Sequence, residues 1–243
     1  MKVDSAGNVY VTGSATGVGS GYDYATIKYS SEGAVLWSRR YNGTGNGNDY
    51  ARALTLDDAG NVYVTGQSFG GASTGEDMVT NKYNSSGASV WLKRYTGPGA
   101  NYDFGTAIVV DTNQNVYVTG DSEGGTTGKD FVTIKYDSAG IPLWIKRFDN
   151  GISDSPVALT INEAGKVYVL GTSAGATSGN DMVVLVYDPD GILVNSHIYN
   201  GPLNGNDVAF DLKISNGGGS IYLCGLSEGG PSGADGVVVK YTP

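Results

Sequence analysis

Aspartates recur along the chain in two series and are the first residues that could do chemistry. Members of the first series each open a run of small and apolar residues: Asp49, Asp103, Asp154 and Asp207. Members of the second series each follow a segment rich in glycine, serine and threonine: Asp23, Asp77, Asp130, Asp181 and Asp235. Carboxylate oxygens are the ligands that a hard cation such as Ca²⁺ prefers. Aspartates in glycine-rich loops also accept hydrogen bonds from their own backbone and thereby fix the loop.

Recurrence in every copy favours the loop-fixing role, because a ligand site seldom needs several identical parts. We therefore expect the second series to be structural loop caps. The first series should ring the mouth of the channel in the fold described below, so it is the candidate ligand-binding set and the alternative site for calcium. The chain holds no EF-hand pattern and no glycine–aspartate calcium repeat, so the sequence predicts no cofactor and assigns no metal ligand.

Three tryptophans recur as well, each followed by two basic residues one position later: Trp37, Trp91 and Trp144. An aromatic ring beside basic side chains could bind a sugar or an anion. Their constant position within each copy instead predicts that they pack between neighbouring copies, with the basic stems covering the outer surface.

No unique catalytic set accompanies these repeated residues. His197 and Cys224 are the single histidine and the single cysteine, which is too few for a histidine- or thiolate-based metal site. No G-x-S-x-G motif is present to hold a nucleophile. The sequence therefore predicts no catalytic residue and no enzyme. Its alternative from the enzyme class is a glycan-active protein that uses two carboxylates such as Asp103 and Asp154.

An internal repeat sets the positions of all these residues. The string NVYVTG or a variant of it begins at Asn8, Asn61, Asn115, Lys166 and Ser220, and successive copies start 51 to 54 residues apart. Each copy holds four short apolar runs, here termed strands A to D; in the second copy they are Ala51–Asp57, Asn61–Gly66, Met78–Tyr83 and Val90–Tyr95. No run has the 3.6-residue period of a helix. Four antiparallel strands in a repeat of this length are typical of one blade of a β-propeller.

The sequence thus predicts one all-β domain over residues 1–243, a β-propeller of about five four-stranded antiparallel blades. The copies span approximately residues 1–41, 49–95, 103–148, 154–199 and 206–241. We expect a closed five-bladed ring whose weakest joint lies between the last and first blades. The alternative is an open arc or a fragment of a larger propeller. The last strand, Gly236–Tyr241, would be an unpaired apolar edge open to self-association.

Connections differ in expected length between the two faces of such a domain. The A–B and C–D turns are tight, whereas the B–C connections (such as Ser68–Glu76 and Ser122–Lys129) and the D–A connections (such as Thr96–Tyr102) are long and polar. In an up-and-down blade, the B–C and D–A connections lie on the same face. We expect partners to bind there, because binding residues tend to sit on loops that a rigid scaffold carries.

The repeat resembles the bacterial β-propeller repeat family SBBP. The resemblance rests on the D-x-x-GNVYVTG-x-S core and its downstream Lys-Tyr, at Asp4–Ser14, Asp57–Ser68 and Asp111–Ser122, and it covers essentially the whole chain. The fourth copy departs most, with Lys166, Leu170 and Val186 at motif positions. The resemblance implies a propeller, usually in exported bacterial proteins, and implies no catalytic residues.

Together these observations predict a non-catalytic binding or scaffold module of an extracellular or cell-surface bacterial protein. Its partner would be a protein or a glycan on the B–C/D–A face. A lectin-like module with shallow sites between blades is the alternative within binding proteins. The net charge of −9 argues against nucleic acid as a partner and against binding at or insertion into a membrane.

Overall fold

The computed structural model describes residues 1–99, 102–125, 128–175, 177–215, 219–230 and 233–242. Across these residues the protein is all-β, as predicted, with four sheets of four strands and a last sheet of three. Within each sheet the strands lie in chain order and every neighbouring pair is antiparallel, so each repeat forms one up-and-down blade. No helix of the described residues is long and apolar enough to cross a membrane.

The strands follow the predicted repeat. The first sheet contains β1 (Lys2–Val3), β2 (Val9–Thr16), β3 (Tyr22–Tyr29) and β4 (Val35–Tyr41). The second contains β5 (Asp49–Leu56), β6 (Val62–Gly71), β7 (Gly75–Tyr83) and β8 (Ser89–Tyr95). The third contains β9 (Asp103–Val110), β10 (Val116–Glu123), β11 (Lys129–Tyr136) and β12 (Pro142–Phe148). The fourth contains β13 (Asp154–Ile161), β14 (Val167–Ala174), β15 (Asn180–Tyr187) and β16 (Leu193–Tyr199). The fifth contains β17 (Asp207–Ile214), β18 (Ile221–Gly230) and β19 (Gly233–Tyr241).

The glycine that ends the NVYVTG motif is required by a bulge in strand A. The register of β5 shifts between Ala51 and Ala53, opposite Gly66 of β6. A Cβ atom on Gly66 would lie only 2.0 Å from the carbonyl oxygen of Tyr50. The bulged backbone therefore approaches so closely that no side chain fits, which explains why the motif keeps a glycine inside a strand.

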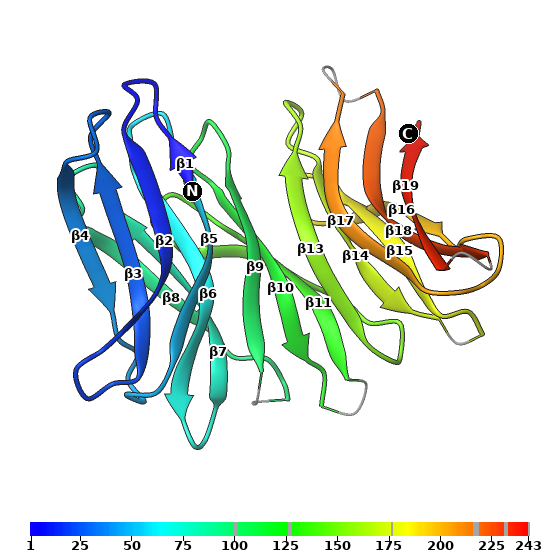
Figure 1. Ribbon diagram of the computed structural model, residues 1–243, viewed down its shortest axis with the longest axis horizontal. Coiled ribbons are helices and arrows are strands. Elements are labelled where there is room, and N and C mark those ends of the chain that lie inside the picture. Colours follow the sequence, from blue (N-terminus) through cyan, green and yellow to red (C-terminus); the bar gives the residue numbers. More distant parts are fainter. Residues whose placement is uncertain (100–101, 126–127, 176, 216–218, 231–232, 243) are drawn as a thin grey trace.

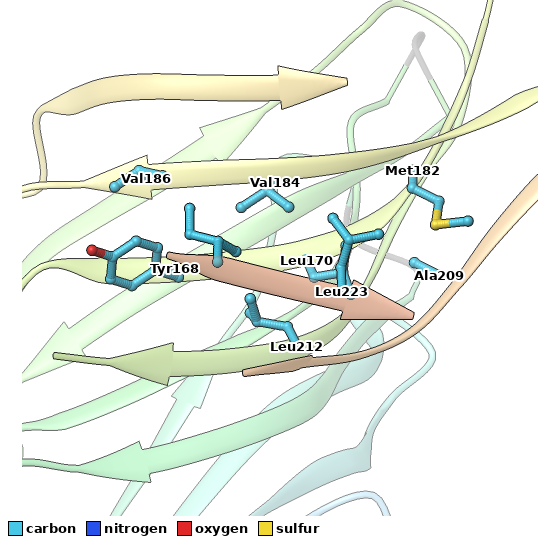
Figure 2. Packing of buried hydrophobic residues seen from close by; sticks show 9 residues of the cluster. Tyr168, Leu170, Met182, Val184, Val186, Ala209, Leu212 and Leu223 are labelled. Atoms are coloured by element: carbon cyan, nitrogen blue, oxygen red, sulfur yellow. The ribbon is translucent and has the colours of Figure 1, made fainter. Parts of the chain in front are cut away.

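The core lies between consecutive sheets rather than within any one of them. Four clusters of buried side chains join the first sheet to the second, the second to the third, the third to the fourth, and the fourth to the fifth. Figure 2 shows the last of these, where Leu170 and Val184 of the fourth sheet face Leu212 and Leu223 of the fifth. Full burial of each such aliphatic side chain contributes about 1.5–3 kcal/mol to folding.

The tryptophans join neighbouring sheets, as predicted. Trp91 lies between Tyr63 of its own sheet and Tyr136 of the next, with ring centroids 6.1 and 6.0 Å away. Its Nε1–H donates to the carbonyl oxygen of Ser138 at 3.1 Å. Gly140 of the same turn has a φ of +77°, and a Cβ there would lie 2.8 Å from the indole. Trp37 and Trp144 make equivalent contacts.

The five sheets form an open arc and not the expected closed ring. The N-terminal sheet lies on the left of Figure 1 and the C-terminal sheet on the right. Among the described residues, no cluster of buried side chains joins the fifth sheet to the first. Val11 of the first sheet and Tyr222 and Val238 of the fifth consequently remain exposed. The number of repeats does not determine closure, because closure depends on the angle between neighbouring sheets.

The B–C connections are shorter than predicted. Pairing between β6 and β7 continues through Phe69↔Glu76 and Gly71↔Gly75, so most of the expected Ser68–Glu76 loop is an extension of the hairpin. Gly71 and Gly75 have φ values of +109° and +65°, which glycine tolerates and which close the hairpin. In the third sheet the pair Glu123↔Lys129 likewise extends β10 and β11 into the expected loop.

Candidate functional site

The B–C and D–A connections lie on the same face of the arc, at the lower edge of Figure 1, as expected. We call this the loop face. Among the described residues it is formed by the B–C tips (residues 17–21, 72–74, 124–125, 128, 175 and 177–179) and the D–A connections (residues 42–48, 96–99, 102, 149–153 and 200–206). Backbone hydrogen bonds tie the two kinds of connection together. Examples are Phe69 N–H to the Asn48 carbonyl at 3.3 Å and Glu123 N–H to the Tyr102 carbonyl at 3.1 Å.

The first series of aspartates lies beneath the D–A connections. Asp49, Asp103, Asp154 and Asp207 all have an exposed fraction of 0%. Each accepts one backbone N–H from the connection that precedes it, from Gly43, Gly97, Asn150 and Gly201 respectively, at 2.6–2.8 Å. The other carboxylate oxygen, Oδ1, is buried without a hydrogen-bond partner among the described residues. These contacts hold the D–A connections in place, and burial keeps the four side chains away from solvent.

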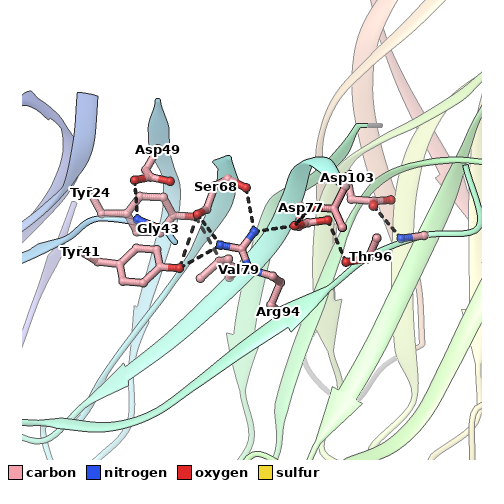
Figure 3. Close-up of polar contacts among 12 residues, drawn as sticks. Tyr24, Tyr41, Gly43, Asp49, Ser68, Asp77, Val79, Arg94, Thr96 and Asp103 are labelled. Carbon is pink, nitrogen blue, oxygen red and sulfur yellow. Dashed lines mark hydrogen bonds and ion pairs between the residues drawn. The ribbon is translucent and has the colours of Figure 1, made fainter. Parts of the chain in front are cut away.

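The second series is held mainly by side chains. Asp77 accepts from Arg94 at 2.5 Å, from Thr74 at 3.1 Å and from Thr96 at 2.8 Å. Arg94 also donates to the hydroxyl of Ser68 at 2.7 Å and to that of Tyr41, in the preceding sheet, at 3.2 Å (Figure 3). One guanidinium therefore links strands C and D, the end of strand B and the preceding sheet.

The same arrangement recurs in two other sheets and is lost in the last two. Arg40 pairs with Asp23, and Arg147 pairs with Asp130. In the fourth sheet Ile198 occupies the arginine position opposite Val183, and Asp181 accepts only from Ser178, at 2.8 Å, within the described residues. Asp235 of the fifth sheet is exposed. The sequence contained this signal, because the second basic residue after each tryptophan is the one that binds the aspartate.

Burial is the main influence on the pKa values of the first series. It raises the pKa of Asp49, Asp103 and Asp154 above the ordinary value of 3.8. The neighbouring hydroxyls of Ser68, Ser122 and Ser173 and the donated backbone N–H groups act in the opposite direction. The same balance occurs at three equivalent positions, so it follows from the loop geometry that the three sheets share.

Grooves between blades also occur on the opposite face, which carries the A–B and C–D turns. One of about 570 Å³ lies between the first and second sheets and one of about 440 Å³ between the third and fourth. In both, a lysine ammonium lies over a tyrosine ring, Lys28 over Tyr10 at 5.0 Å and Lys135 over Tyr117 at 5.3 Å. Sequence reasoning missed these grooves, although the Lys-Tyr pair of the motif supplies their lysines. A smaller cavity of about 170 Å³ on the loop face is lined by Phe69, Gly75, Glu76 and Tyr102.

His197 and Cys224 both lie at the last sheets of the arc. His197 stacks on Tyr241 of the fifth sheet, with ring centroids 4.4 Å apart, whereas Asn195 stands at the tryptophan position of this sheet. Cys224 is a free, half-buried thiol on the outer side of the last sheet. It lines a pocket together with Tyr222 and Val238.

Comparison with known protein families identifies two segments of the repeat. Residues 36–71 and 90–125 match the SBBP family, described as a beta-propeller repeat. These two segments are SBBP beta-propeller repeats. Each begins in strand D of one sheet and continues through strands A and B of the next. A sequence search finds no match among curated proteins.

Solved structures with similar folds have very different sequences. The α-L-arabinofuranosidase Arb93A of Fusarium graminearum is 10% identical, with a TM-score of 0.50 over 98% of this chain and 91% of that one. An α-L-arabinofuranosidase of Lactobacillus brevis is 9% identical, with a TM-score of 0.48 over 99% and 89%. A chain of the mitotic checkpoint complex is 12% identical, with a TM-score of 0.44 over 98% and 75%. At such identities the likeness concerns the fold alone, a β-propeller.

Proposed function

We propose that this chain is a non-catalytic binding or scaffold module of an exported bacterial protein, and that its partner is a protein bound on the loop face. The observation that carries the proposal is a row of exposed apolar side chains on the D–A connections. Tyr102, Ile152 and Leu203 are 51%, 46% and 60% exposed. Aromatic and aliphatic anchors of this kind are typical of protein interfaces.

The backbone that carries these side chains is held in place before any partner arrives. Asp103, Asp154 and Asp207 each bind the backbone of the connection in question. A preorganised connection loses little conformational entropy on binding, which favours affinity. The buried carboxylates recur as copies instead of forming one unique set, which supports a non-catalytic role. Export is inferred from the SBBP repeats, whose family usually occurs in exported proteins.

Site-specific cross-linking in the extracellular fraction of bacteria that produce the chain tests the proposal. A photoreactive residue at Ile152 or Leu203 is expected to give a discrete cross-linked protein, and Tyr102→Ser is expected to weaken that product. Ala59 and Ala139 are the matched control positions, because both are exposed on the opposite face, which carries the A–B and C–D turns. Equal cross-linking from Ala59 and Ala139 would place the partner on the wrong face and overturn the proposal.

A glycan array with and without calcium separates the remaining classes. A non-catalytic protein-binding module should retain no glycan. Binding of several glycan equivalents per chain would instead establish a lectin-like module. Turnover of a bound glycan would show that the protein is an enzyme.

A further inference from the structure

The D–A connection between the third and fourth sheets differs from its counterparts in one chemically important residue. Asp149 stands where the other connections have Asn42, Thr96 and Asn200. In the preceding connection the Thr96 hydroxyl donates to Oδ1 of Asp77 at 2.8 Å. An ionised aspartate can only accept, so Asp149 cannot make the equivalent bond to Asp130.

One oxygen of Asp130 is buried and unsatisfied within the described residues. Asp130 is 2% exposed, and its Oδ2 is bound by Arg147. Its Oδ1 is buried and has no hydrogen-bond partner among the described residues. An unpaired buried acceptor costs about 1–3 kcal/mol, and more when it is charged, so a ligand that binds this oxygen would stabilise the fold.

Three carboxylates converge at this point. One oxygen from each of Asp130, Asp149 and Asp154 lies within 4.8 Å of the other two. Asp154 is completely buried; its Oδ2 accepts the Asn150 N–H at 2.8 Å, while its Oδ1 is unpartnered within the described part of the chain. Asp149 is exposed and leaves the group open to solvent on one side. Three carboxylates beside the single guanidinium of Arg147 leave two net negative charges, which is the charge of one divalent cation.

The ligand type and the partial exposure of the group favour calcium. Ca²⁺ takes six to eight oxygen ligands at about 2.3–2.6 Å, so oxygens on opposite sides of the ion are about 4.6–5.2 Å apart. Mg²⁺ requires about 2.0–2.1 Å in near-octahedral geometry and releases its water reluctantly. We propose that Asp130, Asp149 and Asp154 bind one Ca²⁺ ion, with carbonyl oxygens of residues 149–153 and water completing the coordination. This site is independent of any partner on the loop face.

Calcium titration of the whole chain by calorimetry and by thermal unfolding tests the site. We expect one Ca²⁺ per chain with a dissociation constant of about 10⁻⁴–10⁻³ M, the range of extracellular calcium modules. Asp149→Thr should weaken binding at least about tenfold and reduce the rise in melting temperature with Ca²⁺ accordingly. Because it also restores the hydroxyl of the preceding connection and removes a repelling charge, this variant should melt higher than the wild type without calcium.

The matched control is Asp190→Thr, the same substitution at an exposed aspartate of a C–D turn. It should bind Ca²⁺ as the wild type does. Absence of both a binding heat and a melting shift in the wild type at about 10 mM Ca²⁺, above the expected range of dissociation constants, would overturn the proposal. Undiminished Ca²⁺ binding in Asp149→Thr would overturn it equally.

Discussion

At the scale of single residues, the strand D arginine is the side chain on which each complete blade depends. Arg94 satisfies the carboxylate of Asp77 and spans two sheets through Tyr41. A buried ion pair is costly to break, because removal of one partner leaves the other charge buried and unpaired. The fourth sheet contains such an unpaired buried charge, the carboxylate of Asp181. Its strand D has Ile198, which is 60% exposed, in place of the arginine.

Restoring the arginine should stabilise the fourth sheet. Ile198→Arg is expected to raise the free energy of unfolding by about 1 kcal/mol, because a charge-assisted hydrogen bond to Asp181 outweighs the entropy of fixing the side chain. Urea unfolding measures the change. Ile198→Gln, which lacks the charge, and Ile198→Arg combined with Asp181→Asn should both fail to give the gain. An equal gain in either would show that the ion pair is not its source.

The buried aspartates predict an unusual pH dependence. Burial raises the pKa of Asp103 above 3.8, so the folded chain binds this proton more tightly than the unfolded chain does. The carboxylate therefore destabilises the fold at neutral pH, and the penalty fades as the pH falls through the folded-state pKa towards 3.8. Asp103→Asn, which keeps an acceptor for Gly97 N–H, should be most favourable relative to the wild type at about pH 7 and lose that advantage as the pH falls to about 3.8. Melting temperatures of both proteins at the two pH values decide this, and a constant difference would contradict it.

At the scale of elements, the C–D turns differ in whether a tryptophan packs against them. Gly140 has a φ of +77° and lies against Trp91. Gly33 has a φ of +84°, and a Cβ atom added there would meet no atom of the described residues within 4 Å. The pair therefore separates backbone strain from packing.

Alanine at these two glycines should have unequal effects. Gly33→Ala should cost only the strain of a left-handed residue, about 1–2 kcal/mol. Gly140→Ala should cost more, because its methyl group would also displace the indole of Trp91. Unfolding free energies of the two variants give the comparison, and equal losses would show that the indole adapts without cost.

The strands themselves were predictable from sequence, because apolar runs and their spacing survive in every copy. The same holds for the tryptophan joints, since Trp91 keeps its position relative to the motif. The extension of β6 and β7 was not predictable, because Gly71 and Gly75 read as loop residues while their backbone still pairs. The convergence of Asp130, Asp149 and Asp154 was missed for another reason. Asp149 belongs to neither recurring series. Its significance is evident only from the comparison with Thr96, which donates a hydrogen bond at the equivalent position.

At the scale of the whole molecule, the arc ends in two surfaces that resemble the two sides of every internal joint. Tyr222 occupies the position of the buried Tyr168, yet it is 38% exposed, and Val238 is 73% exposed. On the first sheet Val11, equivalent to the buried Val64, is 37% exposed. The number of sheets could be predicted from the sequence. The angle between neighbouring sheets could not, because it depends on how closely their side chains pack against each other.

These end surfaces predict head-to-tail association of two copies, in addition to strand addition at the β19 edge. Contact between the fifth sheet of one copy and the first sheet of another would bury the exposed apolar residues. Val238→Lys should weaken association measured by sedimentation equilibrium. Val90→Lys, at a rim position that is 53% exposed, should leave it unchanged. A wild-type chain that stays monomeric at high concentration would refute the prediction.

The boundaries of the SBBP segments bear on how such a protein changes over generations. Residues 36–71 contain the tryptophan of one sheet together with strands A and B of the sheet on which it docks. Each matched segment therefore spans the contact between two neighbouring blades. Unequal recombination between equivalent points of two copies would insert or delete one full period of 51 to 54 residues, so a gene of this kind can lengthen or shorten its product by one four-stranded unit in a single event.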